Sequence, residues 1–405
     1  MPSIQTRADA GLTRHATAPR ERRLRQTAAW GLLALQGIAQ LGAIWDREWH
    51  HYIGRDSFFI PPHILIYSGV LGAGIIALAV VLTDTRRYHR GAPGVDDTST
   101  TRVFGWFHAP LGYIIAGFGI LDMLASAPLD NYWHELYGID VVLWAPFHLM
   151  GIAGGLIGML GMMYIFASEE TICRERGEPR QRFLQLTALE WGMVAVVATF
   201  LAYVFTGFLQ LPILSEGLLN LPTATFAVAM AGAFAFPALA RFTHVPGVAT
   251  LTLAPLLAYS ILEQFFLPWG VTTFSAALGM SFRVADRPAF SLTDAALPLI
   301  YLLPALIVDG WTRWRLRRGV ALNGRLWNDA PLGALIAHLP GAAASCLLLG
   351  SWNVVAVLFE QPGVTIPPEL KAQAALIGIP ITLLFGAAGA VGAALFGDIW
   401  RWSQR

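Results

Sequence analysis

Aspartate and histidine recur at the spacing of metal ligands near the end of the first apolar run. Asp46 precedes His50 by four residues, and His63 follows after a short link that contains proline. Four residues on a helix is about one turn, so the first two side chains lie on one face. A second helix that begins near His63 returns its imidazole to the end of the first. The spacing therefore predicts one carboxylate and two imidazoles around a common point.

A second segment repeats these residue types at the same offsets. Its corresponding residues are Asp130, His134 and His148, with one extra residue before the last histidine. The neighbours that recur at equal offsets are Trp49 with Trp133, Gly54 with Gly138, and Asp56 with Asp140. We interpret this agreement at several uncommon residue types as an internal duplication.

Two imidazoles and one carboxylate form a ligand set for copper, iron or zinc, and three protein ligands leave positions open for water, dioxygen or substrate. Asp56 and Asp140 either orient an imidazole N–H from behind or bind a metal themselves, and we prefer the first role. Further residues expected beside the ligands are Trp49, Trp133 and Asn131. A single histidine at a helix end is more often an ordinary interfacial residue. Here the two segments hold five of the ten histidines, namely His50, His51, His63, His134 and His148.

The composition indicates that membrane-crossing helices must position these residues. The chain has 405 residues, of which 55% are hydrophobic and 13% are charged. A soluble protein has about a quarter of its residues charged, so we expect this surface to face lipid. The net charge of +1 and the absence of a basic patch in the sequence argue against nucleic acid as a partner.

Ten apolar runs are long enough to cross a hydrocarbon core of ~30 Å. They lie near 28–45, 61–83, 106–126, 143–168, 187–213, 221–241, 247–268, 292–311, 331–360 and 373–399. Arginines collect before the first run and then in every second connection, which predicts that these connections and both termini are cytoplasmic. We therefore expect an all-α, polytopic integral membrane bundle in a bacterial-type inner membrane, with both motifs toward the extracytoplasmic side.

The runs and the charged connections divide the chain into four parts. We expect a disordered cytoplasmic tail at 1–27, a four-helix metal-binding unit at 28–170, a charged cytoplasmic linker at 171–186 and a six-helix unit at 187–405. The loop at 269–291 suits a segment lying at the membrane interface. Solitary polar residues within the runs are weaker candidates for a cavity or proton path; they are Glu190, Gln210, Glu263, Asp309 and His338.

The first motif resembles the metal-site segment of the C subunit of particulate methane monooxygenase and ammonia monooxygenase. The resemblance rests on Asp46, Trp49-His50, Arg55-Asp56, Phe59, Pro62-His63-Ile64 and Tyr67, and it covers roughly residues 28–170. In that family one site uses an Asp and two His at this spacing, and a second uses Asn and two His with the last gap one longer. The present chain has Asp130 at the Asn position, and Asn131 is adjacent.

The resemblance implies copper sites and a copper-dependent membrane monooxygenase that oxidises a small apolar or ammonia-like substrate with dioxygen. It also implies partner membrane subunits beside the lipid bilayer. Residues 187–405 and the lack of a soluble copper-binding domain depart from the family. Two other functions stay open: a metal or small-solute transporter, since transporters also contain repeats, and a non-catalytic metal-binding subunit of a membrane complex.

Overall fold

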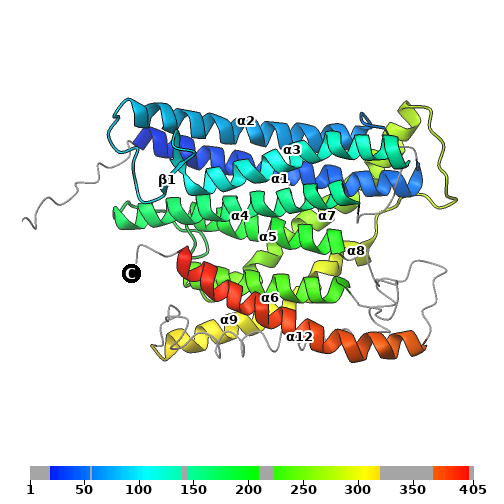
Figure 1. Cartoon of the computed structure of the whole chain (residues 1–405). Helices are drawn as coiled ribbons and strands as arrows, with labels where there is room; N and C mark the ends of the chain where they lie inside the picture. The colour runs from blue at the N-terminus through cyan, green and yellow to red at the C-terminus, as the bar shows by residue number, and fades with distance from the viewer. Residues whose placement is uncertain (1–18, 55–56, 139–144, 209–222, 320–367, 401–405) are drawn as a thin grey trace, which may run out of the picture.

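The computed structural model describes residues 19–54, 57–138, 145–208, 223–319 and 368–400, and these fold almost entirely into helices (Figure 1). Six helices in this part of the chain are long and apolar enough to cross a membrane: Arg22–Tyr52, Pro61–His89, Leu111–Tyr137, Pro146–Glu175, Val248–Ala277 and Leu292–Arg317. Three shorter apolar helices lie at Ala188–Val204, Ala227–Thr243 and Leu383–Gly397. The predicted run at 331–360 lies outside the described residues. The chain is thus a membrane-embedded helical protein.

The N-terminal half contains two helical hairpins. The first pairs α1 (Pro19–Tyr52) with α2 (Pro61–His89), and the second pairs α3 (Leu111–Tyr137) with α4 (Pro146–Glu175). Both α2 and α4 begin with proline, whose fixed φ suits the first turn of a helix. The motif ends of α1 and α3 and the starts of α2 and α4 consequently lie at one end of the bundle (Figure 1).

Glycine holds the second hairpin together. A Cβ added at Gly119 would lie 2.4 Å from the backbone nitrogen of Gly158, and one at Gly161 would lie 2.4 Å from that of Ala116. A Cβ at Gly112 would meet the backbone nitrogen of Ile165 at 2.6 Å. Small residues one turn apart let two membrane helices approach to backbone contact. This close packing fixes α3 against α4 and hence the direction of the second motif.

The opposite end of the bundle is tied by a buried ion-pair network. The α1 helix begins at Pro19, so residues 19–27 form its first turns instead of the expected tail. The reason is that Arg25, 1% exposed in its side chain, pairs with Asp84 of α2 at 2.9 Å and with Asp97 at 2.7 Å. Two antiparallel strands, β1 (Thr100–Val103) and β2 (Phe107–Pro110), follow before α3 begins.

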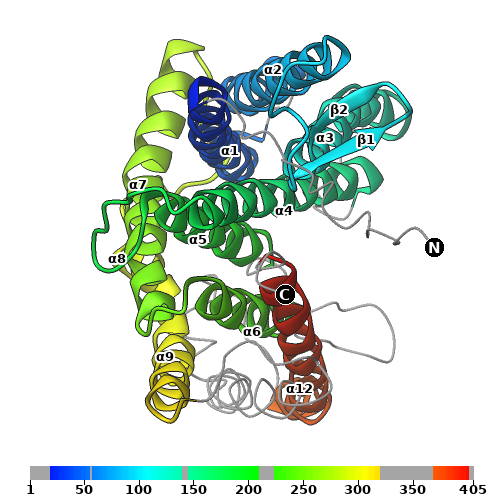
Figure 2. The same cartoon turned by 90° about the vertical axis from the view of Figure 1, so that its left-hand side faces the viewer.

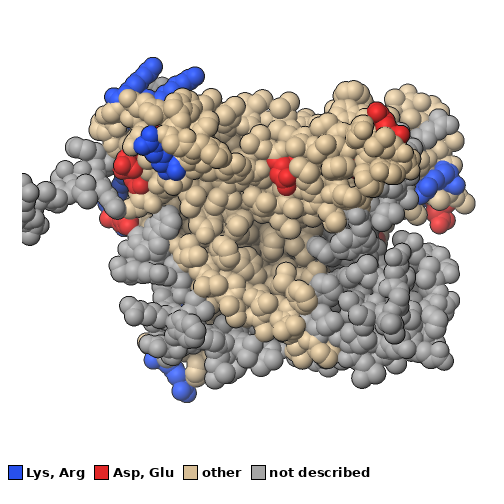
Figure 3. Space-filling view, viewed as in Figure 1, with Lys and Arg blue, Asp and Glu red and all other residues tan. Residues whose placement is uncertain are grey.

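The C-terminal half is built from α5 (Ala188–Phe208), α6 (Thr223–Thr243), α7 (Val248–Ala277), α8 (Leu292–Ala296), η1 (Leu297–Tyr301), α9 (Leu302–Arg317) and α12 (Pro368–Ile399). Residues 269–277 continue α7, so the segment expected at the interface begins only after Ala277. Figure 2 shows α7 crossing beside α1 and α5, and it contacts both. In Figure 3 the charged residues gather toward the two ends of the bundle, and most of the surface between them is uncharged.

Candidate metal centre

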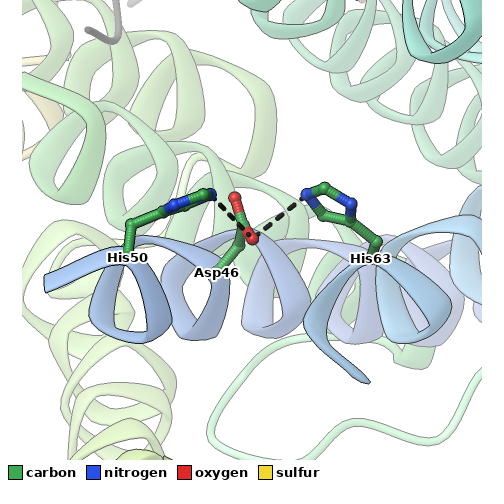
Figure 4. A group of neighbouring side chains, drawn as sticks. All are labelled: Asp46, His50 and His63. Carbon is green, nitrogen blue, oxygen red and sulfur yellow. Dashed lines mark ion pairs between the residues drawn. The ribbon is translucent and has the colours of Figure 1, made fainter. Parts of the chain in front are cut away.

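The first motif converges on one carboxylate oxygen. Nε2 of His63 lies 3.1 Å from Oδ1 of Asp46, and Nε2 of His50 lies 3.6 Å from the same atom. Asp46 and His50 come from the last two turns of α1, and His63 from the first turn of α2 (Figure 4). The three side chains are partly buried, at 15–22% exposure. The hairpin thus brings the three predicted residues together.

The second motif has the same arrangement on α3 and α4. Nε2 of His134 and Nε2 of His148 each lie 3.3 Å from Oδ2 of Asp130. The extra residue before His148 does not prevent convergence. The two imidazole centroids are 6.0 Å apart, which leaves room between the rings for an ion contacted by both.

These distances suit one metal ion at each motif. In each group the three ligand atoms lie within 4.8 Å of one another. Bonds of about 2.0–2.2 Å to a common ion place ligand atoms roughly 3–4 Å apart. The nitrogen and oxygen donors match the preferences of copper, iron and zinc, and do not distinguish among the three. Three protein ligands leave coordination positions for water or a small molecule.

Residues far along the chain hold the first motif in place. The backbone N–H of Arg283 donates to the carbonyl of Tyr52 at 2.9 Å, and its Nε donates to the carbonyl of His51 at 2.8 Å. Gly54 has φ +70°, and a Cβ there would lie 2.6 Å from Cδ of Arg283. Glycine is therefore required at this position for its conformation and for the approach of Arg283.

The corresponding turn in the second motif has a different contact. Gly138 also has a positive φ, +85°, but no atom of the described residues lies within 4 Å of an added Cβ. Its carbonyl lies 3.3 Å from Nδ1 of His134. A carbonyl at that nitrogen favours Nδ1–H, which leaves Nε2 as the lone-pair donor facing Asp130. The turn thus orients a ligand.

The two groups are neighbours. The imidazole of His63 is close enough to Asp130 for an electrostatic interaction. This proximity follows from the packing of α2 on α3, in which Gly74 lies against Ile120 and Leu124. A cation at either group would consequently influence the other.

The remaining predicted residues have varied positions. Asp56 and Asp140 lie outside the described residues. Trp49 is fully buried and packs with Trp45 in a hydrophobic cluster beside the first motif. Trp133 packs edge-on against Phe147 next to the second motif. Asn131 donates to Glu135 at 3.0 Å, a contact within α3 on the exposed surface.

Sequence reasoning did not identify Arg283 as part of the motif's surroundings. It lies 232 residues from His51 along the chain, and no local pattern marks it. Comparisons of the chain with protein-family models, curated proteins and solved structures find no match. The interpretation of the site therefore depends on the geometry of the two groups and on the motif spacing.

Proposed function

We propose that the chain is a membrane-embedded metalloprotein that binds copper at both Asp-His-His groups and is related to copper membrane monooxygenases. The observation that supports this most strongly is the convergence of three nitrogen and oxygen donors within 4.8 Å at each of two motifs, whose spacings differ by one residue before the last histidine. The substrate class is small apolar molecules or ammonia, oxidised with dioxygen. Iron and zinc are the competing metals.

The residues of each group have distinct tasks in this proposal. Asp46 and Asp130 supply a negative charge that attracts the cation, and the four histidines supply neutral donors that fix its direction. Bound copper would contribute one-electron redox chemistry toward dioxygen. The ligand side chains are 14–31% exposed. This exposure leaves a path for water, dioxygen and a small substrate to the open positions.

Both groups lie at the same end of the bundle, and the proposal places that end on the extracytoplasmic side of an inner membrane. Its support is the arginine distribution, which favours a cytoplasmic location for the other end. A tag inserted after Tyr137 should react with an impermeant reagent in intact cells. Reaction only after the membrane is opened would reverse this orientation.

The metal assignment is tested on the purified full chain by metal analysis and copper electron paramagnetic resonance. We expect about two equivalents of copper per chain, since each group is a separate three-donor site. His50→Ala and His134→Ala should each remove about one equivalent. The matched control for the first is His51→Ala, whose exposed ring contacts Tyr52 edge-on and is not one of the three converging donors. Copper content unaffected by His50→Ala would overturn the assignment.

The enzymatic part requires a separate measurement. Copper-loaded protein with an external reductant should consume dioxygen faster when a short alkane or ammonia is added, and the oxidised product should appear. Bound copper without substrate-dependent dioxygen consumption would favour a non-catalytic metal-binding subunit. Copper movement across vesicles that contain the protein would favour the transporter.

A further inference from the structure

Buried polar side chains occur on α1 and on α7, which packs against it, apart from the metal groups. The carboxamide oxygen of Gln36 lies near Gly158 of α4. Glu263 of α7 is 5% exposed, Gln40 of α1 is 2% exposed and Gln36, one turn earlier, is 6% exposed. All three belong to helices that are apolar enough to span a membrane. Ionisable groups at such depth are costly and are typically retained for a function.

The contacts between the helices place Glu263 at the level of Gln40. Tyr259 donates to the carbonyl of Gly37 at 3.0 Å, and Gly270 lies against the ring of Trp45. The two helices therefore run in the same direction. Glu263 follows Tyr259 by one turn, and Gln40 follows Gly37 by nearly one turn. Gln40 and Asp46 are six positions apart, which places them on different faces of α1.

Four polar atoms of these side chains lack a hydrogen-bond partner in the described part of the chain. Oε1 of Glu263, both side-chain polar atoms of Gln40 and Nε2 of Gln36 are buried without a hydrogen bond. An unsatisfied buried polar atom costs about 1–3 kcal/mol. A carboxylate, two carboxamides and water can satisfy one another, and the carboxylate needs a cation or a proton as well.

The other solitary polar residues predicted for a cavity or proton path are accounted for by structural contacts, or lie outside the described residues. Glu190 accepts from the backbone N–H of Thr187 at 2.8 Å and pairs with Arg174. Asp309 accepts from the backbone N–H groups of Ala249 and Thr250. Gln210 and His338 lie outside the described residues. Among the solitary polar residues that the structure describes, Glu263 is the one for which no such structural contact accounts.

Few charged groups of the described residues act on Glu263. Arg47 of α1 is the charged group that acts on it electrostatically, and Arg47 itself pairs with Glu48 at 2.9 Å. The other titratable groups on α7 and on the described elements packed against it are Tyr259 on α7, Glu190 and Tyr203 on α5, Arg241 on α6, Asp294 on α8, Tyr301 on η1, and Asp309, Arg313, Arg315 and Arg317 on α9. Those of α1 lie toward its two ends, at 20–25 and 46–52. Tyr203, Tyr301 and Asp309 bond to backbone groups of other elements. A neutral, protonated Glu263 fits these surroundings.

We propose that Glu263, Gln40 and Gln36 form a proton-binding site in the membrane interior, with Glu263 as the group that takes up and releases the proton. An O–H bond forms on the carboxylate as a hydronium ion becomes water, and the reverse step returns the proton to water held by the two carboxamides. This site does not depend on metal binding, since it lies on another face of α1.

Infrared difference spectroscopy of the full chain in lipid vesicles, recorded against pH, tests the site. The wild type should show a protonated carboxyl band near neutral pH that disappears as pH rises. Glu263→Gln, which keeps the shape and removes the titration, should abolish the band. Gln40→Leu should shift it, because the carboxamide that holds water beside the carboxyl is lost. Glu190→Gln is the matched control and should leave the band unchanged, because Glu190 is paired.

Three results would contradict the proposal. A band that persists in Glu263→Gln belongs to another carboxyl. A band that Gln40→Leu does not move excludes the carboxamides from the site. Loss of the band when sodium chloride replaces potassium chloride at constant pH would identify a sodium site instead. Copper content measured on the same Glu263→Gln sample should equal that of the wild type, so failure here is distinguishable from failure of the metal proposal.

Discussion

The two motif copies have similar ligand geometry in different surroundings. The first, on α1 and α2, packs against α7, with Trp45 and Trp49 in a buried cluster beside Leu267 and Val271. The second, on α3 and α4, is at the edge of the described structure. Its neighbours are exposed: Tyr132 at 57%, Leu136 at 56% and Tyr137 at 70%.

This difference separates two levels of structure. Ligand convergence depends on a helical spacing of four residues and a hairpin, both encoded locally, so it occurs in both copies. The surroundings depend on which distant helix packs alongside, and α7 packs beside α1. We therefore expect loss of a metal-ligand residue to have the same effect in both copies. Loss of a side chain that packs beside the ligands should have different effects in the two copies.

Loss of the carboxylate should have the largest effect and should be equal in the two copies. Asp46→Ala and Asp130→Ala each remove the oxygen on which two imidazoles converge. We expect each to lower bound copper by about one equivalent, because the group loses one of its three donors and its only negative charge. Metal analysis checks this, with Glu135→Ala as the control on α3. Loss of all copper from either variant would show one shared cluster instead of two sites.

Loss of the tryptophan should distinguish the copies. Trp49 is fully buried, so Trp49→Ala should lower the free energy of unfolding by about 3–5 kcal/mol through the cavity it leaves. Trp133 is only partly buried, and Trp133→Ala should cost about 1 kcal/mol. Equilibrium unfolding in mixed detergent measures both. Equal losses would mean that the second copy is covered as fully as the first.

The sequence predicted the features of the two copies that depend on residues close together in the chain. The apolar runs indicated the membrane helices, and the Asp-His spacing indicated which side chains converge. It did not predict that α1 extends to Pro19, because the partners of Arg25 lie 59 and 72 residues away. The contact of Arg283 with the first motif was also not predicted, because Arg283 lies 232 residues from His51 along the chain. Long-range pairings are set by packing, which no spacing pattern records.

The ion pairs of Arg25 lie at the end of the bundle opposite the metal groups. A substitution there tests whether a change far from the metal groups leaves metal binding unaffected. Burial alone would raise the pKa of Asp97, but the Arg25 guanidinium and hydrogen bonds from Ser99 outweigh it and hold that pKa below its ordinary value. A lowered pKa means that the carboxylate stabilises the fold above the unfolded pKa. That stability is lost as pH falls through the folded pKa.

Asp97→Asn should therefore lower the free energy of unfolding at neutral pH by about 2 kcal/mol, the range for hydrogen bonds to charged groups. It should also flatten the fall in stability on acidification. Unfolding measured at neutral and acidic pH checks both, and bound copper should stay at the wild-type level. A loss of copper in this variant would show that the two ends of the bundle are coupled.

The smallest effect should come from Arg283, the distant residue that contacts the first copy. Arg283→Ala removes the hydrogen bond from Nε to the carbonyl of His51 and keeps the backbone bond to Tyr52. One such bond contributes about 1 kcal/mol, which corresponds to roughly a five-fold change in affinity. Because the end of α1 carries His50, we expect this weakening at the first group and unchanged affinity at the second. Competition titrations with a copper chelator on His134→Ala and His50→Ala backgrounds isolate the two groups. Arg287→Ala is the matched control, since its guanidinium lies over the ring of Phe282. Equal weakening at both groups would mean that the loop acts on the whole end of the bundle, and the difference between the copies would not arise from Arg283.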